Sequence, residues 1–290
     1  MIELTWVADA LRVGGLLFVL IYYGAAALLI YKAARWKKPL WQKAAALAVV
    51  GITFGYLPVS GYLEQRERRA YAKAAWDRFN KYCAEKAGEK IYRRVTDVES
   101  VLVMRPRPDA SETQFTDQQW RGDPYGFGLS DAAEIGSLLR PDRASANTPL
   151  LMGYTFAEVS IVDGSGLRQT KQYRVVKRDA SDAAYNDLQT EVVNNQRSKF
   201  GFTWEDISTD EDRRFWIAGG VLRVVDLTTN EIIAERVGYL IDPLFGNRSS
   251  GRVPWLAAVS RSCPSRMQGE LRITRRFLTQ VLQPIIREGN

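Results

Sequence analysis

The chain has 290 residues, of which 46% are hydrophobic and 25% charged, and its formal net charge is +7. It contains no histidine, which excludes Ser-His-Asp and Cys-His catalysis, histidine acid–base chemistry and histidine-ligated zinc or haem. Its two cysteines are too few for a four-thiolate zinc or iron–sulfur site, so we predict no cofactor and no metal.

The basic excess raises the question of an anionic partner. The sequence has no block of five or six like charges and no glycine-aromatic RNA-binding motif. Nucleic acid is therefore not predicted as a partner. Part of the excess lies beside two apolar segments, where membrane topology explains it.

Residues 11–31 form the first apolar segment. They carry no charge after Arg12 and are long enough to cross about 30 Å of hydrocarbon as a helix. Glu3 and Asp9 make the preceding segment acidic, and no A-x-A site is followed by a sequence typical of a mature protein, which argues against a cleaved signal peptide. We predict a transmembrane helix here.

Residues 44–63 are uncharged throughout, although Pro58 falls in their last third, and they predict a second transmembrane helix. Gly51 and Gly55 form a G-x-x-x-G pair, a spacing that lets two helix backbones approach closely. The partner of this face is either the first span or a second copy of the chain, which would form a homo-oligomer.

Five basic residues and no acidic residue lie between the two spans, at Lys32, Arg35, Lys37, Lys38 and Lys43. The positive-inside rule places this loop, residues 32–43, in the cytoplasm and both termini outside. Three arginines shortly after the second span oppose this orientation, but glutamates interleave with them. Residues 1–63 are thus predicted to anchor the protein in the lipid bilayer.

Cys83 and Cys263 lie near the two ends of the remaining chain. In an oxidising compartment such a pair usually forms a disulfide. Closing a loop of this length stabilises a fold by roughly 4 to 5 kcal/mol in the chain-entropy model. The alternative is two buried free thiols in a reducing compartment, and the predicted topology favours the disulfide.

Residues 64–90 are rich in helix-favouring residues without proline and predict a helical stalk ending near Gly88. Valine-rich residues 91–104 predict one or two strands. Residues 105–147 are rich in Pro, Gly, Asp and Ser and predict loops, with a short helix beginning near Asp131.

Residues 150–162 and 167–177, joined at 163–166, predict the clearest β-hairpin. A polar loop is expected over 178–197, strands over 200–204, 216–226 and 231–241, and an amphipathic helix over 271–286 with a kink near Pro284. Residues 91–290 are therefore predicted to form an α+β domain, with a mainly antiparallel sheet of about five to seven strands packed with a few helices.

A glycine-flanked basic loop is the first candidate site in this domain. Asn247, Arg248 and Arg252, with nearby backbone N–H groups, would suit a phosphate, a carboxylate or an anionic glycan. The spacing matches no P-loop, and a solvated surface loop has the same composition.

Aromatic residues form a second candidate. Trp204, Trp216 and Trp255 would line a sugar or peptide groove, although aromatics at strand positions also serve core packing.

Acidic residues give weaker signals. Residues 206–212 alternate oxygen ligands as calcium loops do, but lack the turning glycine and the final glutamate. A helix start with a capping box from Ser208 and Glu211 fits better. Glu205 with Asp206, or Asp123 with Glu134, are conceivable acid pairs for glycan cleavage. No catalytic residue is assigned.

Several stretches together carry a resemblance, namely residues 83–92, 123–126, 206–213, 216–219, 229–236 and 263–264. This set resembles a group of proteobacterial inner-membrane proteins with N-terminal transmembrane segments and a periplasmic domain. The group has no assigned activity, so the resemblance implies only the location, in agreement with the charge argument.

These features predict a membrane-anchored periplasmic module that binds a protein partner in the bacterial envelope, in assembly, secretion or an immunity-type role. The alternatives are a sensor of an anionic ligand or glycan, which predicts a concave site at the Arg248/Arg252 loop, and an acid-pair glycan hydrolase, which predicts two carboxylates within about 10 Å in an open cleft.

Overall fold

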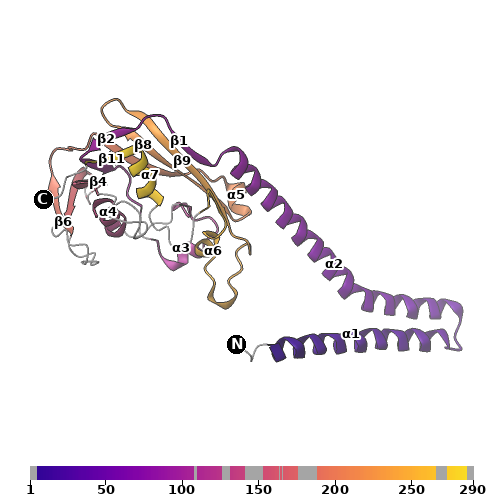
Figure 1. The fold of residues 1–290 in the computed structure, drawn as a ribbon. Helices are drawn as coiled ribbons and strands as arrows, with labels where there is room; N and C mark the ends of the chain where they lie inside the picture. Colours follow the sequence, from indigo (N-terminus) through magenta and orange to yellow (C-terminus); the bar gives the residue numbers. More distant parts are fainter. Residues whose placement is uncertain are drawn as a thin grey trace. The chain divides into compact units, whose positions relative to one another are not determined.

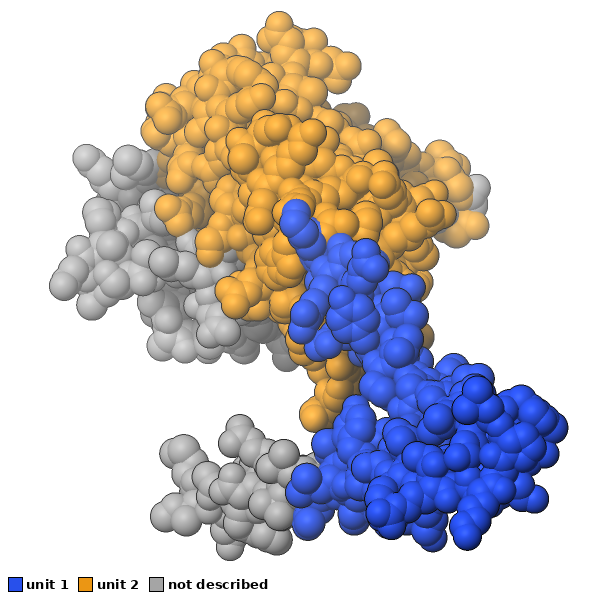
Figure 2. All heavy atoms as spheres, turned by 90° about the vertical axis from the view of Figure 1, so that its right-hand side faces the viewer, with its two compact units in different colours: residues 1–73 blue, residues 74–290 orange. Residues whose placement is uncertain are grey.

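The structure is a computed structural model, and it describes residues 5–107, 110–125, 131–140, 153–162, 164, 166–175, 188–265 and 273–285. The chain divides into two compact units, Met1–Lys73 and Ala74–Asn290, which Figure 2 colours separately. The first unit holds helix α1 and most of helix α2. The second holds the end of α2 and the sheet domain (Figure 1).

Helix α1 spans Thr5–Ala34 and helix α2 spans Leu40–Glu85. Both run beyond the predicted spans, so the connection is shorter than the expected loop over 32–43. Lys and Arg favour helix, and the carbonyl of Pro39 accepts hydrogen bonds from the amides of Gln42 and Lys43 at the start of α2.

Helix α2 has 46 residues, with Pro58 inside it. This is more than twice the roughly 20 residues that cross a bilayer, and the predicted second span and the stalk belong to one helix. Among the residues searched, α2 alone is long and apolar enough to cross a membrane, while Val19–Ala34 of α1 forms a shorter apolar helix.

The strands are β1 (Gly88–Ile91), β2 (Val95–Val98), β3 (Ser100–Val103), β4 (Phe156–Val162), β5 (Arg168–Val175), β6 (Leu188–Val193), β7 (Phe200–Asp206), β8 (Ile217–Asp226), β9 (Glu231–Ile241), β10 (Ser262–Cys263) and β11 (Leu282–Pro284). The main sheet has nine strands in the order β1-β9-β8-β7-β3-β4-β5-β6, with β10 also on β9. It exceeds the predicted five to seven strands.

The α+β class with a mainly antiparallel sheet is confirmed. β3 is the exception within the main sheet, because it pairs in parallel with both β4 and β7. The remaining main-sheet pairs are antiparallel, including the expected hairpin of β4 and β5. Two residues of the turn predicted at 163–166 lie outside the described residues.

The one or two strands predicted over residues 91–104 are confirmed as β2 and β3, and Asp97 within β2 has a positive φ of 57°. Two other local predictions were wrong. Part of the expected 178–197 loop is β6, because its backbone pairs with β5 along its whole length. The C-terminal helix α7 covers only Ile273–Val281, and the chain then extends as β11, which pairs in parallel with β2.

The main core lies on one face of the sheet, beneath α4 (Asp131–Leu139) and α7 (Figure 1). Leu138 on α4 and Phe277, Leu278 and Val281 on α7 are almost fully buried there. The 3.6-residue helical period places these α7 side chains on one stripe, which is why a nine-residue helix buries them together.

A second hydrophobic cluster packs against the same sheet near the end of β9. It is formed where α3 (Glu112–Thr116) and α6 (Pro254–Ala258) meet residues 117–125. A third cluster lies where the last three turns of α2 cover β8 and β9. It joins Ala75 and Phe79 to Ile217, Tyr239 and Ile241. The side-chain alternation of β8 separates these clusters, since Ile217 and Ala218 enter different ones.

Candidate functional site

The end of helix α2 is held to the sheet domain by one buried carboxylate. Asp212, on the short helix α5 (Asp210–Arg214), accepts a hydrogen bond from Arg78 Nε at 2.5 Å and from the Tyr82 hydroxyl at 2.9 Å. Arg78 also pairs with the exposed Glu211 at 3.0 Å. Arg78 and Tyr82 lie four residues apart, so one face of α2 presents both to α5.

Asp212 also starts its own helix. Its other carboxylate oxygen accepts from the backbone N–H and the hydroxyl of Thr209, at 2.8 and 2.7 Å, and the Thr209 hydroxyl accepts from the amide of Asp212. The capping box is therefore formed one residue later than the predicted pair of Ser208 and Glu211. Ser208 instead accepts from the amide of Gly219 at 2.8 Å.

The charge on Asp212 is stabilised by these donors. Burial alone raises the pKa of the carboxyl, but the hydrogen bonds from Thr209, Arg78 and Tyr82 outweigh it, and the pKa lies below the ordinary value of 3.8. For Tyr82, burial first and then the negative neighbour Asp212 raise the pKa. The carboxylate is thus ionised and the phenol neutral at ordinary pH, which preserves this junction.

A second ion-pair group lies next to the first. Arg213 is fully buried, pairs with Asp206 at 2.6 Å and lies over the Trp255 ring at 5.0 Å. Burial lowers the pKa of its guanidinium, and Asp206 opposes that shift. Arg121 binds the carboxylate of Asp210 on the surface of the same group. Each carboxylate of residues 206–213 therefore pairs with an arginine.

Cys83 and Cys263 are joined in a disulfide, with Cα atoms 5.5 Å apart. Cys83 lies in the last turn of α2, and Cys263 lies on β10, which pairs with β9 beside Tyr239. The disulfide therefore fastens the same end of α2 that Asp212 holds. We call this set the stalk clamp: Arg78, Tyr82, Asp212 and the disulfide Cys83–Cys263.

Two glycines of the sheet leave room for residues 123–125 to pack closely against it. Gly220 and Gly238 are directly opposite each other on β8 and β9. A Cβ at Gly238 would lie 1.8 Å from Tyr125 Cζ, and one at Gly220 would lie 2.3 Å from Asp123 Oδ1. Only glycine permits this contact, so the tight packing of the segment depends on these two positions.

The predicted anion loop is largely committed to contacts within the domain. Arg252 binds the buried carboxylate of Asp242 with both terminal nitrogens and donates to the carbonyl of Asn247 at 2.9 Å. Arg248 is exposed and donates to the carbonyl of Thr116 at 2.7 Å. Since Asp242 neutralises Arg252, the loop presents one cation, which is weak support for a phosphate or glycan site.

The three tryptophans do not line an exposed groove. Trp204, Trp216 and Trp255 are 3%, 8% and 0% exposed. Trp216 and Trp255 pack together with ring centroids 5.1 Å apart, whereas Trp204 belongs to the main core and lies under Arg105 at 4.3 Å. Trp204 packs inward from β7 and Trp255 from α6, while Trp216 directly precedes β8.

The predicted acid pairs are bound to arginines. Asp123 and Glu134 both accept from Arg107, at 3.1 and 2.9 Å, and Asp123 and Arg107 are buried. Glu205 and Asp206 are consecutive on β7, so their side chains lie on opposite faces. Neither pair is the pair of uncompensated carboxylates in an open cleft that glycan cleavage needs.

In the parts of the chain that the structure describes, no group of three or more acidic or cysteine side chains is arranged to hold a metal ion.

The glycines Gly51 and Gly55 face open space, since a Cβ on either would meet nothing within 4 Å. They therefore do not form the seam with α1. Tyr22 does, because its hydroxyl donates to the carbonyl of Phe54 at 2.9 Å.

Sequence reasoning missed the stalk clamp apart from its disulfide. Asp212 is separated from Arg78 by 134 residues and from Tyr82 by 130, and no local pattern links them. The available signal was the i, i+4 spacing of Arg78 and Tyr82 on a predicted helix, without an acidic partner at matching spacing.

Comparison of the chain with known protein families, with curated proteins and with solved structures finds no match to any of them.

Proposed function

We propose that this protein is a membrane-anchored envelope module. Helices α1 and α2 both span the bacterial inner membrane, the 35–39 connection is cytoplasmic, and the sheet domain binds a protein partner in the periplasm. The observation that carries the proposal is the continuity of α2 from an apolar segment into a clamp within the domain. A continuous helix with a fixed end couples a membrane segment to a folded domain.

The clamp supports a mechanical or positional role. The disulfide, the Asp212 ion pair and the buried Phe79 side chain all act within the last three turns of α2. A flexible linker would need none of them. A tether that orients the domain for a partner benefits from each, because ordering the junction in advance reduces the entropy lost on binding.

The charges of the domain support binding over catalysis. Arg107, Arg213 and Arg236 are buried, and each pairs with a carboxylate. Such pairs hold a fold in one arrangement, whereas a general acid or base needs a group that contacts substrate. The disulfide favours an oxidising compartment, in agreement with the side that the positive-inside rule gives to the domain.

The orientation is tested with reporter fusions. Alkaline phosphatase, which is active only in the periplasm, is fused after Asn290 and, as the matched control, after Lys37 in the connection. We expect an active enzyme from the first fusion and an inactive one from the second. The reverse pattern would overturn the orientation, and two inactive fusions that remain in the cytosolic fraction would overturn the anchor.

The partner is tested by site-specific photo-crosslinking in cells at endogenous expression. Val192 on the edge strand β6 and Leu244 after β9 are 59% and 53% exposed, and both are suitable positions for the probe. The exposed Thr229 in the β8–β9 turn is the polar control. One stoichiometric envelope protein, crosslinked from Val192 or Leu244 but not from Thr229, supports the proposal.

Recovery of the uncrosslinked protein alone would argue against a protein partner. The domain would then be screened against anionic cell-wall fragments, with Arg248→Gln as the variant that removes the exposed cation of the loop. Crosslinks only between copies of this chain would instead favour a homo-oligomer, with Gly51 and Gly55 as the face to mutate first.

A further inference from the structure

A cavity of about 690 Å³ lies between α1 and α2 beside their connection. Its apolar wall is formed by Leu29, Ala33, Ala46 and Val50. The small alanines leave room between helices that are held together elsewhere by Tyr22 and Phe54, whose rings are 5.0 Å apart. A volume of this size is typical of sites for small organic ligands.

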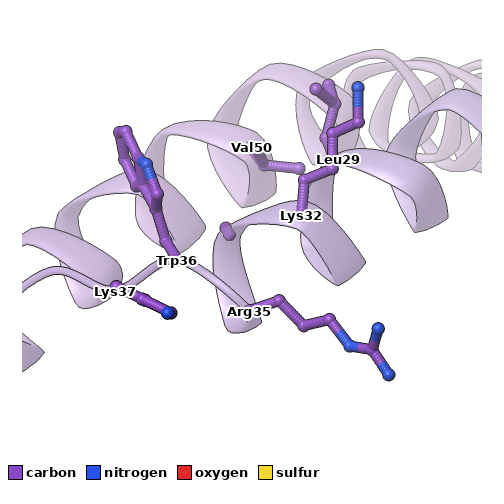
Figure 3. A pocket seen from close by; sticks show the side chains of 8 residues that line it. Leu29, Lys32, Arg35, Trp36, Lys37 and Val50 are labelled. Carbon is purple, nitrogen blue, oxygen red and sulfur yellow. The ribbon is translucent and has the colours of Figure 1, made fainter.

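The remaining lining residues are cationic or aromatic. They are Lys32, Arg35, Trp36 and Lys37. Figure 3 shows the Lys32 and Trp36 side chains extending to one side of the ribbon, while Arg35 and Lys37 extend to the other. Arg35 lies over the Tyr31 ring at 4.8 Å. Lys32 is therefore the cation that we assign to a ligand in the cavity.

The positive charge of the α1–α2 connection is not balanced by acidic residues in the parts of the two helices beside it. No residue from 10 to 63 is acidic, whereas five between 32 and 43 are basic. In the sheet domain, by contrast, arginines such as Arg107 and Arg252 pair with carboxylates. Lys43 donates to the carbonyl of Ala34 at 3.4 Å, which uses one cation at the end of α1. The others are exposed and attract anions from outside the chain.

Aromatic side chains indicate the depth of the cavity in a bilayer. Trp36 and Trp41 flank the connection and are 50% and 69% exposed. Tryptophan at the ends of membrane helices prefers the headgroup level. If the helices span the bilayer as proposed above, the cavity lies where phosphate groups meet the acyl chains, with its cations on the headgroup side.

We propose that this cavity binds one anionic phospholipid, with Lys32 holding the phosphate and the apolar wall covering part of an acyl chain. The inference rests on the proposed membrane anchor. Basic pockets between membrane helices on the cytoplasmic side suit anionic headgroups. A soluble phosphate would use the cation but not Leu29, Ala33, Ala46 and Val50, whereas a phospholipid uses both.

The experiment uses the full-length protein purified in a mild detergent, with native mass spectrometry to count bound lipids. Dioleoyl-phosphatidylglycerol competes with dioleoyl-phosphatidylcholine, which has the same chains and a neutral headgroup. We expect the anionic lipid to be retained preferentially. Each cation near an anionic headgroup contributes about a fivefold preference, so Lys32→Gln is expected to reduce the preference about fivefold.

The matched control is Arg66→Gln. It removes the same charge from an exposed position of α2 outside the cavity, and we expect the preference to remain. A second variant, Ala46→Phe, fills the cavity while every cation stays in place, and it is expected to release the anionic lipid. Full retention by Ala46→Phe would overturn the site.

Three other results would also overturn the site: equal retention of both lipids, an unchanged preference in Lys32→Gln, or an equal loss in Arg66→Gln. Failure of the anchor is distinguished by flotation with liposomes at alkaline pH. A chain that does not float refutes the membrane anchor. A chain that floats but shows no lipid preference refutes only the lipid site.

Discussion

Replacing Asp212 by alanine is expected to loosen the stalk clamp. The substitution leaves the donors of Arg78, Tyr82 and Thr209 without their shared acceptor. Hydrogen bonds to a charged group contribute about 1.5 to 3 kcal/mol each, and a lost N-terminal cap costs about 1 kcal/mol. These values are not additive.

The magnitude is discounted because Arg78 is 24% exposed and keeps Glu211 as a partner. We expect a loss of about 3 kcal/mol in the free energy of unfolding. For a domain of this size, this corresponds to a fall in Tm of roughly 6 to 12 °C. The assay is thermal unfolding of the full-length protein in detergent, followed by tryptophan fluorescence and near-UV circular dichroism.

Glu211→Gln is the matched control. It removes the neighbouring carboxylate, which also pairs with Arg78 but is 61% exposed, and exposed ion pairs contribute less than about 1 kcal/mol. A loss below about 1 kcal/mol for Asp212→Ala, or one equal to that of Glu211→Gln, would refute the assignment of Asp212 as the residue that holds α2.

The pH dependence gives an independent check. The pKa of Asp212 is lowered from 3.8 on folding, so its stabilisation is fully present above about pH 5 and is lost as the pH falls through the folded pKa. The stability difference between the wild type and Asp212→Ala should therefore be constant near neutral pH and shrink below about pH 4. A constant difference down to pH 2 would contradict this reasoning.

Three further outcomes follow from the structure. Replacing Cys83 and Cys263 by serine should cost about 5 kcal/mol, and a reductant should lower the Tm of the wild type but not of this variant. Gly238→Ala should cost at least about 3 kcal/mol in urea unfolding, because its Cβ would overlap the Tyr125 ring. Glu158→Gln should cost about 2 kcal/mol in the same assay, since this buried carboxylate accepts from the backbone N–H groups of Arg197 and Ser198; no change would refute its role in holding the 197–198 turn.

The candidate sites show where local patterns are insufficient. Trp204, Trp216 and Trp255 were compatible with a groove and with a core, and only the tertiary packing of two separate clusters decided that all three are buried. Arg252 was predicted as an anion ligand, but it pairs with Asp242. Asp242 directly follows β9 and precedes Arg252 by ten residues. In both cases, composition specified the residue type and the tertiary structure specified its partner.

The sequence by itself determined the apolar helices, the clustered basic connection, the helical stalk, the main hairpins and the pairing of its only two cysteines. Each follows from periodicity, charge or counting within short windows. Only the tertiary structure decided that α2 is one helix clamped by Asp212, that β3 lies between parallel neighbours, and that a cavity opens beside Lys32 and Lys37. These features join residues far apart in the chain, and their energies depend on burial and distance, which no local window contains.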